Sequence, residues 1–297
     1  MENACTNALL PQYDIWTQFV ANTLIAALEL DALKNSHPIE VDVGHPSEVD
    51  EIFDDISYNK GASVIRMLHN YIGNEAFRQG MKGYLTKFSY KNTLTADLWT
   101  SLEEASGKPV GKIMSTWTGQ MGFPVIKVEH AAESKSLTLT QEKFDADGGK
   151  DEKSKNFHWN VPIKILTSDG NEQEFLLEDK SMTIKLENLD SQMWYKVNPN
   201  FVGYFRVAYD DKDVQNLEML RAAIRDQKLS EVDRLGLLDD TFALVQAGKT
   251  STVDALKLMD AFKDREESYV CWSAIVNCLV KLRLILSDSN FYESHFQ

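Results

Sequence analysis

The chain has 297 residues, of which 43% are hydrophobic, so it can fill buried cores and wholesale disorder is excluded. Its 31 Lys and Arg against 45 Asp and Glu give a net charge of -14, which argues against general binding to nucleic acid or a membrane surface. Three cysteines make no disulfide framework, and the amino terminus lacks a secretory signal. The most apolar stretch, residues 270–286, is interrupted by Lys281 and Arg283 and is predicted to fall short of a membrane span. We therefore expect a soluble, cytoplasmic protein.

Helical spacing dominates residues 13–122. One helix is predicted from Ser57, which is placed to cap its start, to Gly73, which is placed to end it. Later helices are predicted to begin at Asn74, Thr95 and Pro109.

Between residues 123 and 210 the apolar period changes from that of a helix to two, which is typical of strands. Seven short segments show this period: 124–128, 136–140, 161–166, 174–177, 183–186, 194–197 and 205–209. Because polar turns separate them, they predict a small β-sandwich, which we expect to be the most independently stable part of the chain. The polar segment 145–155 is predicted to be a long surface loop.

Helical spacing resumes after residue 210. Ser230 followed by Asp233 predicts the start of a helix that Gly248 ends, and two more helices are predicted near 256–262 and 272–286. Paired helices of this kind can begin an α-solenoid. Their apolar faces have too few partners within the chain, so we expect association through exposed helical faces.

The common catalytic motifs are missing from the sequence. It contains no Gly-x-Ser-x-Gly, no Gly-x-Gly-x-x-Gly and no phosphate-binding loop. No two of the six histidines are three to five residues apart, so no helical zinc pair exists, and we assign no metal to this chain. His37 and His45, each before a proline, are interpreted as ordinary surface or turn histidines.

Four segments nevertheless carry a specific pattern. They are residues 35–39 (NSHPI), 50–68 (DEIFDDISYNKGASVIRML), 92–99 (NTLTADLW) and 117–125 (WTGQMGFPV). In order and spacing these segments resemble the gluzincin (M1) family of zinc aminopeptidases. The resemblance extends through residues 203–209 and 233–237 and so covers essentially the whole chain.

The resemblance implies a multidomain α+β fold. Residues 1–122 would be the C-terminal part of a thermolysin-like aminopeptidase catalytic domain. Residues 123–210 would be a β-sandwich, and residues 211–297 would begin a C-terminal, α-helical superhelical domain and leave it truncated.

The resemblance also implies which parts of the active site this sequence lacks. The family holds its zinc with a His-Glu-x-x-His motif and a later glutamate, and the substrate amine with a Gly-x-Met-Glu-Asn loop. Neither motif occurs in the 297 residues. We therefore expect zinc in the complete family member and none bound to this chain.

Two site residues follow from the resemblance. Tyr58 matches the tyrosine that stabilises the oxyanion of the transition state, and Phe53 matches an aromatic residue that lines the pocket for the first substrate side chain. The alternatives are a buried structural tyrosine at a helix start and a core phenylalanine. The acidic run of Asp50, Glu51, Asp54 and Asp55 could attract a peptide amine, but complementing a helix dipole is the simpler interpretation.

Two functional hypotheses remain open from the sequence. The first is a fragment of a zinc-dependent aminopeptidase that releases N-terminal residues from peptide substrates, inactive as the isolated chain. The second is a non-catalytic binding or decoy protein derived from an aminopeptidase.

Overall fold

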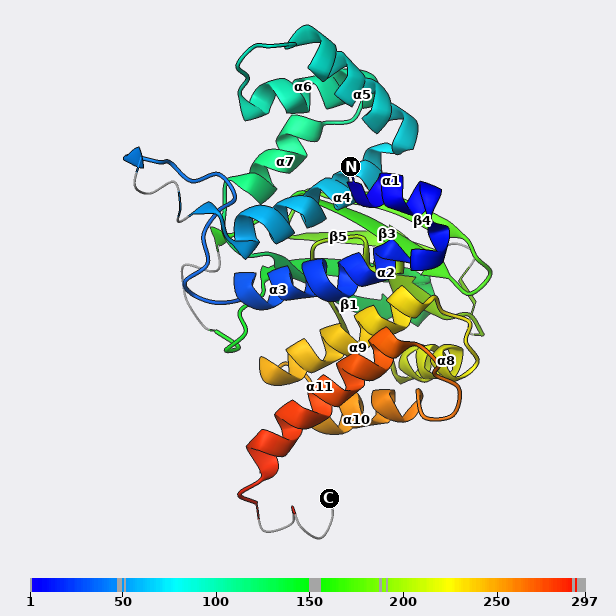
Figure 1. Cartoon of the computed structure of the whole chain (residues 1–297). Helices are drawn as coiled ribbons and strands as arrows, with labels where there is room; N and C mark the ends of the chain where they lie inside the picture. The colour runs from blue at the N-terminus through cyan, green and yellow to red at the C-terminus, as the bar shows by residue number, and fades with distance from the viewer. Residues whose placement is uncertain are drawn as a thin grey trace.

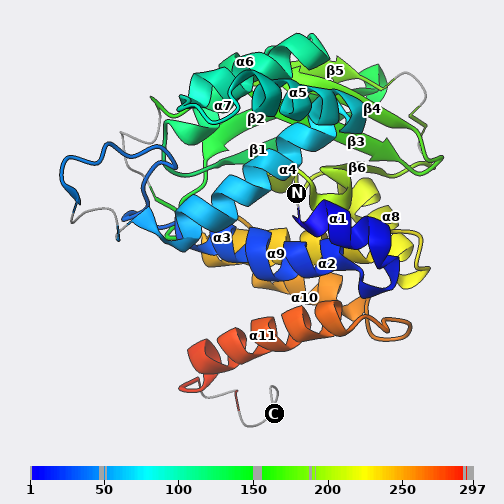
Figure 2. The ribbon, with the colours of Figure 1, turned by 45° about the horizontal axis from the view of Figure 1, so that its top comes forward.

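The computed structural model describes residues 2–46, 50, 52–149, 156–186, 189–190, 192–289 and 292. Helices α5 to α7 lie at one end of the molecule and α8 to α11 at the other, with the strands between them (Figure 1). The view turned by 45° shows the same order (Figure 2). The predicted mixture of helices and sheets in one α+β chain is confirmed.

The described residues of the amino-terminal part form α-helices and two π-helical segments. The α-helices are α1 (Glu2–Leu9), α2 (Ile15–Phe19), α3 (Ile25–Asp31), α4 (Gly61–Ile72), α5 (Asn74–Lys87), α6 (Thr95–Ser106) and α7 (Val110–Thr118). The π-helical segments are η2 (Val20–Leu24), which joins α2 to α3, and η4 (Ile56–Lys60), which leads into α4. The predicted helix starts at Asn74 and Thr95 are confirmed. Among the described residues between α3 and η4 there is no α-helix, so helical structure is not continuous from 13 to 122.

The prediction that Ser57 caps the helix is wrong. The backbone N–H of Ser57 donates to the Asp54 Oδ1 atom at 2.8 Å, so Asp54 supplies the capping oxygen and Ser57 lies inside the first turn. The carboxylate three residues earlier satisfies an amide that has no partner within the helix. The predicted end is confirmed, because Gly73 follows the last residue of α4 with a φ of 88°.

The strands form two sheets, and all seven predicted strands are present. They are β1 (Pro124–Ala131), β2 (Ser136–Lys143), β3 (Val161–Thr167), β4 (Glu172–Leu177), β5 (Ser181–Lys185), β6 (Tyr195–Val197) and β7 (Arg206–Tyr209). One sheet has the order β5-β2-β1-β7 and the other β4-β3-β6. All neighbours are antiparallel except β1 and β7, which are parallel. The regular alternation of buried and half-buried residues in β2 and β3 matches the period that predicted them.

The predicted surface loop at 145–155 is partly buried. Asp145 is only 5% exposed and forms an ion pair with Lys143, which is also buried. This end of the loop can be buried because each charge of the pair offsets part of the free-energy cost of removing the other from water. Residues 150–155 lie outside the described residues.

Among the described residues, four α-helices follow the strands. They are α8 (Val214–Arg225), α9 (Glu231–Gln246), α10 (Thr252–Asp260) and α11 (Tyr269–Leu286). The predicted start at Ser230 is confirmed, because its hydroxyl oxygen accepts the Asp233 N–H at 3.1 Å. Gly248 follows the end of α9 with a φ of 65°, as the sequence predicts.

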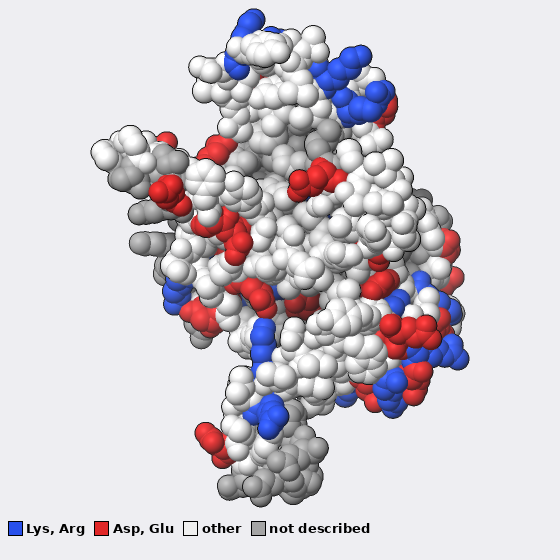
Figure 3. Space-filling model, in the orientation of Figure 1, with Lys and Arg blue, Asp and Glu red and all other residues white. Residues whose placement is uncertain are grey.

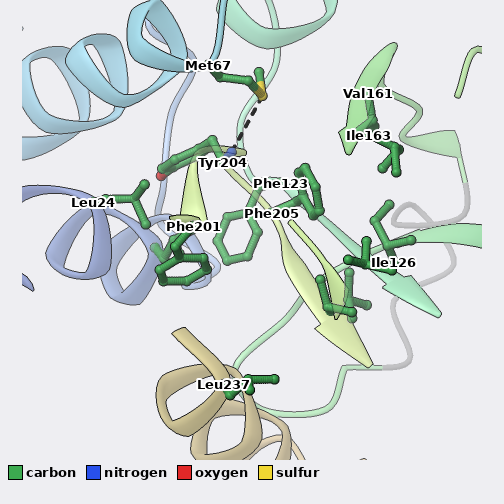
Figure 4. Close-up of a cluster of buried hydrophobic side chains, with 14 of the residues drawn as sticks. Leu24, Met67, Phe123, Ile126, Val161, Ile163, Phe201, Tyr204, Phe205 and Leu237 are labelled. Atoms are coloured by element: carbon green, nitrogen blue, oxygen red, sulfur yellow. Dashed lines mark hydrogen bonds between the residues drawn. The ribbon is translucent and has the colours of Figure 1, made fainter. Parts of the chain in front are cut away.

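One buried cluster joins all parts of the chain (Figure 4). It contains Leu24 and Met67 from the amino-terminal helices, Phe205 from the strand region and Leu237 from α9. The backbone N–H of Tyr204 donates to the Met67 sulfur at 3.5 Å, which is the dashed contact in the figure. The helices and sheets therefore share a hydrophobic core across the proposed boundaries at 122 and 210.

Helix α11 has the length and composition of a membrane-crossing helix. It has 18 residues with a mean hydropathy of 1.6, and 22% of them are buried. By length and mean hydropathy, the expectation that this stretch falls short of a span is therefore wrong. The helix continues through Lys281 and Arg283, and its mean hydropathy stays high in spite of them. A core helix of a soluble protein meets the same measures, so they do not place α11 in a membrane.

Acidic side chains are spread widely over the face shown in Figure 3, whereas Lys and Arg gather at its upper end and, mixed with acidic side chains, at its lower right. Much of the middle of this face is uncharged. The distribution agrees with the net charge of -14.

Candidate functional site

Tyr58 and Phe53 lie side by side on the surface. Their ring centroids are 6.1 Å apart with the planes tilted by 35°. Tyr58 is 60% exposed and Phe53 is 62% exposed, so the alternatives of a buried structural tyrosine and a core phenylalanine are wrong. Two residues that the resemblance singles out for different roles are thus brought together by the fold.

A short network holds the turn that carries Tyr58. The Tyr58 N–H donates to the Asp54 carbonyl at 3.1 Å, and the Ser57 N–H donates to the Asp54 side chain. Tyr58 itself lies in the π-helical segment η4, a kind of turn that is frequent at functional sites. Asp54 therefore acts on the local backbone, as the simpler interpretation of the acidic run expects, while Glu51 lies outside the described residues.

His37 supports Asp54 from another segment. Its Nε2 atom lies 2.5 Å from the Asp54 Oδ2 atom, and its Nδ1 atom lies 2.7 Å from the Pro38 carbonyl oxygen. Burial favours the neutral imidazole, but these two acceptors outweigh it and raise the pKa of His37. Burial likewise opposes the charge on Asp54, but the Ser57 N–H and His37 outweigh it and lower the pKa of Asp54.

A buried ion pair fixes the other end of η4. The Lys60 ammonium lies 3.0 Å from the Asp31 carboxylate, and both side chains are fully buried. Lys60 also donates to the backbone carbonyls of Gln120 and Gly122, at 3.2 and 3.0 Å. Burial lowers the pKa of Lys60, and Asp31 opposes that shift.

Asp31 joins three segments at this pair. Its Oδ1 atom accepts the Gly122 N–H at 2.8 Å, and its Oδ2 atom accepts the Tyr204 hydroxyl at 3.3 Å. Gly122 has a φ of 79°, a conformation that favours glycine, and an added Cβ would lie 2.8 Å from the Lys143 side chain. The end of α3, η4, the turn before β1 and the segment before β7 are therefore tied to one charged centre.

The site can offer one hydrogen-bond donor and one apolar ring. The Tyr58 hydroxyl has no hydrogen-bond partner within the part of the chain that the structure describes, so it can donate to an external oxygen. The Phe53 ring beside it presents an exposed apolar face.

The described residues do not fit a zinc ion. Across the described ranges, no three His, Cys, Asp or Glu side chains gather closely enough to hold a metal. Among the described residues, His37 contacts one carboxylate, that of Asp54, and its other ring nitrogen lies against the Pro38 carbonyl oxygen. The expectation that this chain binds no zinc stays a prediction, and no step through a metal is derived from these residues.

Sequence patterns did not find the supporting residues. The sequence interpreted His37 as an ordinary turn histidine, and 17 positions separate it from Asp54, a spacing that no local motif signals. Asp31 and Lys60 carried one signal, since each places a charge on a helix that is otherwise apolar on its inner side. Only the fold shows that these charges face one another.

Comparisons with known proteins agree with the resemblance. Residues 1–117 match the family model described as the peptidase family M1 domain, and residues 194–297 match the ERAP1-like C-terminal domain. Similar curated proteins include the puromycin-sensitive aminopeptidase of Caenorhabditis elegans, 39% identical over 290 residues, which are 95% of this chain and 30% of that protein.

Two further relatives come from a plant and a yeast. The aminopeptidase M1-A of Oryza sativa subsp. japonica is 43% identical over 86% of this chain and 29% of its own length. The alanine/arginine aminopeptidase of Saccharomyces cerevisiae is 37% identical over 93% of this chain and 31% of its own length. The chain thus spans about 30% of the length of these relatives. The two family models and these relatives agree, and the chain belongs to the M1 family of peptidases.

Proposed function

We propose that this chain forms the oxyanion-stabilising side of an aminopeptidase active site whose substrates are peptides. The observation that carries the proposal is the pairing of Tyr58 and Phe53, exposed side by side on a turn that buried charges hold in place. Similarity to curated aminopeptidases over 95% of the chain supports the reaction class.

Tyr58 would donate its hydroxyl proton in a hydrogen bond to the oxygen that gains charge when the peptide carbonyl is attacked. Such a donor stabilises the transition state most when it is already aimed, because no reorganisation is then needed. The contacts from Asp54 and the Asp31–Lys60 pair supply that fixed position.

Phe53 would contact the first substrate side chain. An exposed ring offers apolar and cation–π surface to side chains of different types. Its place next to Tyr58 would put this contact close to the reacting carbonyl.

The 297 residues alone would not hydrolyse peptides. A tyrosine hydroxyl stabilises charge but does not generate the attacking nucleophile, and the described residues do not fit the family's metal.

We also propose domain boundaries at residues 122 and 210. Residues 1–122 would derive from a thermolysin-like catalytic domain, and residues 123–210 would be a β-sandwich. We propose a cytoplasmic location for the protein.

A chimera tests the role of Tyr58. This chain would replace the matching 290-residue segment of the Caenorhabditis elegans puromycin-sensitive aminopeptidase, and hydrolysis of an aminoacyl fluorogenic substrate would be measured. We expect an active chimera in which Tyr58→Phe lowers kcat by about 100- to 1000-fold with little change in KM, because one oxyanion donor is lost.

Tyr90→Phe is the matched control, since Tyr90 is also exposed and loses the same hydroxyl. In the chimera, Tyr90→Phe should leave kcat unchanged. The isolated 297-residue chain, measured separately, should show neither turnover nor stoichiometric zinc. An active chimera in which Tyr58→Phe behaves like Tyr90→Phe would remove Tyr58 from the mechanism.

A second candidate function is a non-catalytic binding or decoy protein. The exposed apolar side chains of α11 favour it, since unpaired apolar surface marks binding partners. In one outcome the chimera folds and has no activity, while the isolated 297-residue chain binds a full-length aminopeptidase. That result would support this role over the enzymatic one.

A further inference from the structure

A cavity of 480 Å³ lies between the amino-terminal helices and α9, away from the site just described. Its lining residues come from α2, α4, the turn after β6 and the start of α9: Asp14, Trp16, Thr17, Arg66, Asn200 and Ser230 are among them. Its volume is typical of small-molecule sites. Neither Tyr58 nor Phe53 lines it.

Arg66 brings a positive charge to this cavity without a negative partner. Its guanidinium donates to the Phe201 carbonyl at 2.8 Å and the Asn200 carbonyl at 3.1 Å, and lies over the Trp16 ring at 5.3 Å. No described carboxylate lies within 4.0 Å of it, and burial lowers the pKa of Arg66 to about 10. Two of five guanidinium N–H groups are used, so others can bind a carboxylate.

The start of α9 faces the same space. Ser230, Glu231 and Val232 line the cavity, and α9 has 16 residues. The Ser230 hydroxyl accepts the Asp233 N–H, whereas the first amides of a helix have no acceptor within it. These amides and the helix dipole add a second positive contribution for an anion.

Asp14 supplies the opposite charge. It lines the cavity, its side chain is exposed, and no hydrogen bond or ion pair of its carboxylate occurs among the described residues. The other acidic lining residue, Glu231, accepts a hydrogen bond from the Ser268 hydroxyl. A dianion such as phosphate would meet repulsion from these carboxylates, whereas a ligand with one charge of each sign would complement both ends.

Apolar walls complete the cavity. Trp16, Val202 and Val232 line it together with the charged groups. They offer contact to an apolar or aromatic body of a small ligand.

We propose that this cavity binds a free α-amino acid with an apolar or aromatic side chain. Arg66 and the first turn of α9 hold its carboxylate, Asp14 holds its ammonium group, and Trp16 packs on its side chain. The site does not depend on Tyr58 or on peptide hydrolysis.

Calorimetric titration of the 297-residue chain tests the proposal with three probes. L-phenylalanine carries both charges, 3-phenylpropionate lacks the ammonium and phenethylamine lacks the carboxylate. We expect L-phenylalanine to bind at least about 10-fold more tightly than either analogue, because each analogue leaves one charged group of the cavity unpaired. Equal binding of L-phenylalanine and an analogue, or no binding of L-phenylalanine, overturns it.

Two substitutions locate the site. Asp14→Asn and Arg66→Gln should each weaken L-phenylalanine binding by about 10-fold or more, and Asp14→Asn should leave binding of 3-phenylpropionate unchanged. Arg78→Gln is the control, because Arg78 is exposed and pairs with Glu75 outside the cavity. If Arg66→Gln does not fold, the test rests on Asp14→Asn, because Asp14 is exposed and its substitution should not affect folding. Unchanged L-phenylalanine binding in Asp14→Asn overturns the proposal.

Discussion

Single residues show how an exposed functional group can depend on buried charges. Tyr58 is exposed, but Lys60, two positions later, is fully buried and pairs with Asp31 at 3.0 Å. Removing one member of such a pair leaves the other charge buried and costs about 3–5 kcal/mol. The pair therefore ties the end of η4, two residues after Tyr58, to the end of α3.

A second buried charge cluster contributes to the pH dependence of stability. The Arg206 guanidinium lies 2.6 Å from Asp239 and 3.1 Å from Asp240, and the Val207 N–H donates to Asp240 at 3.1 Å. Burial raises the pKa of Asp240 from 3.8 to about 7, with Arg206 opposing the shift and Asp239 adding to it. The charge of Lys196 also opposes the shift.

Asp240→Asn should therefore flatten the pH dependence of unfolding. Between pH 3.8 and about 7 the folded chain holds a proton on Asp240 that the unfolded chain has released, so its contribution to stability falls as pH rises. We expect the free energy of unfolding of the native chain, relative to the variant, to fall by roughly 1–4 kcal/mol across that window. Urea titrations at pH 4.5, 6 and 8 measure it, and a pH-independent difference would contradict the prediction.

Helix α11 buries only part of its apolar surface. Its apolar residues at helical spacing separate into two groups, since Ile275 and Leu282 are buried while Trp272 and Leu279 are 40% and 39% exposed. Leu284 and Ile285 near its end are more than 70% exposed. The helix therefore contacts α9 along one narrow face and leaves much of its apolar surface open.

Two matched isoleucines on α11 test this arrangement. Ile275 is 5% exposed and Ile285 is 73% exposed. Ile275→Ala should lower the free energy of unfolding by about 2–5 kcal/mol, because it opens a cavity, whereas Ile285→Ala should change it by about 0.5 kcal/mol or less. Denaturant unfolding at equal protein concentration measures both, and equal losses would show that α11 buries its outer face, for example by self-association.

The described residues share one core rather than forming a separate core in each part of the chain. Tyr204 and Phe205, which precede β7, are fully buried among residues that include Leu24, Met67 and Leu237 (Figure 4). The strands therefore depend on helices from both flanks to cover their aromatic residues. This packing argues against the expectation that the strand region is the most independently stable part.

An isolated 123–210 segment should therefore not fold cooperatively. Without its flanks it would expose Phe201, Tyr204 and Phe205, each at most 1% exposed in the whole chain. We expect no sigmoidal urea transition and no ordered near-ultraviolet circular dichroism for the segment, and we expect both for the 297-residue chain. A cooperative transition in the isolated segment would restore the independent domain.

The sequence by itself determined the elements and the family. Periods of 3.6 and two predicted the helix starts at Asn74, Thr95 and Ser230 and all seven strands, because these depend on local burial patterns and capping. Its motifs predicted the M1 family, which the comparisons confirm. They also singled out Tyr58 and Phe53, whose functional roles stay predictions.

Only the tertiary structure decided what surrounds those residues. It brought His37 to Asp54, Asp31 to Lys60 and β7 alongside β1 in parallel, pairings between residues far apart in the chain. Such contacts depend on how whole elements pack, so no local period or spacing encodes them. For the same reason the cavity around Arg66, built from segments near residues 14, 66, 200 and 230, left no signal in the sequence.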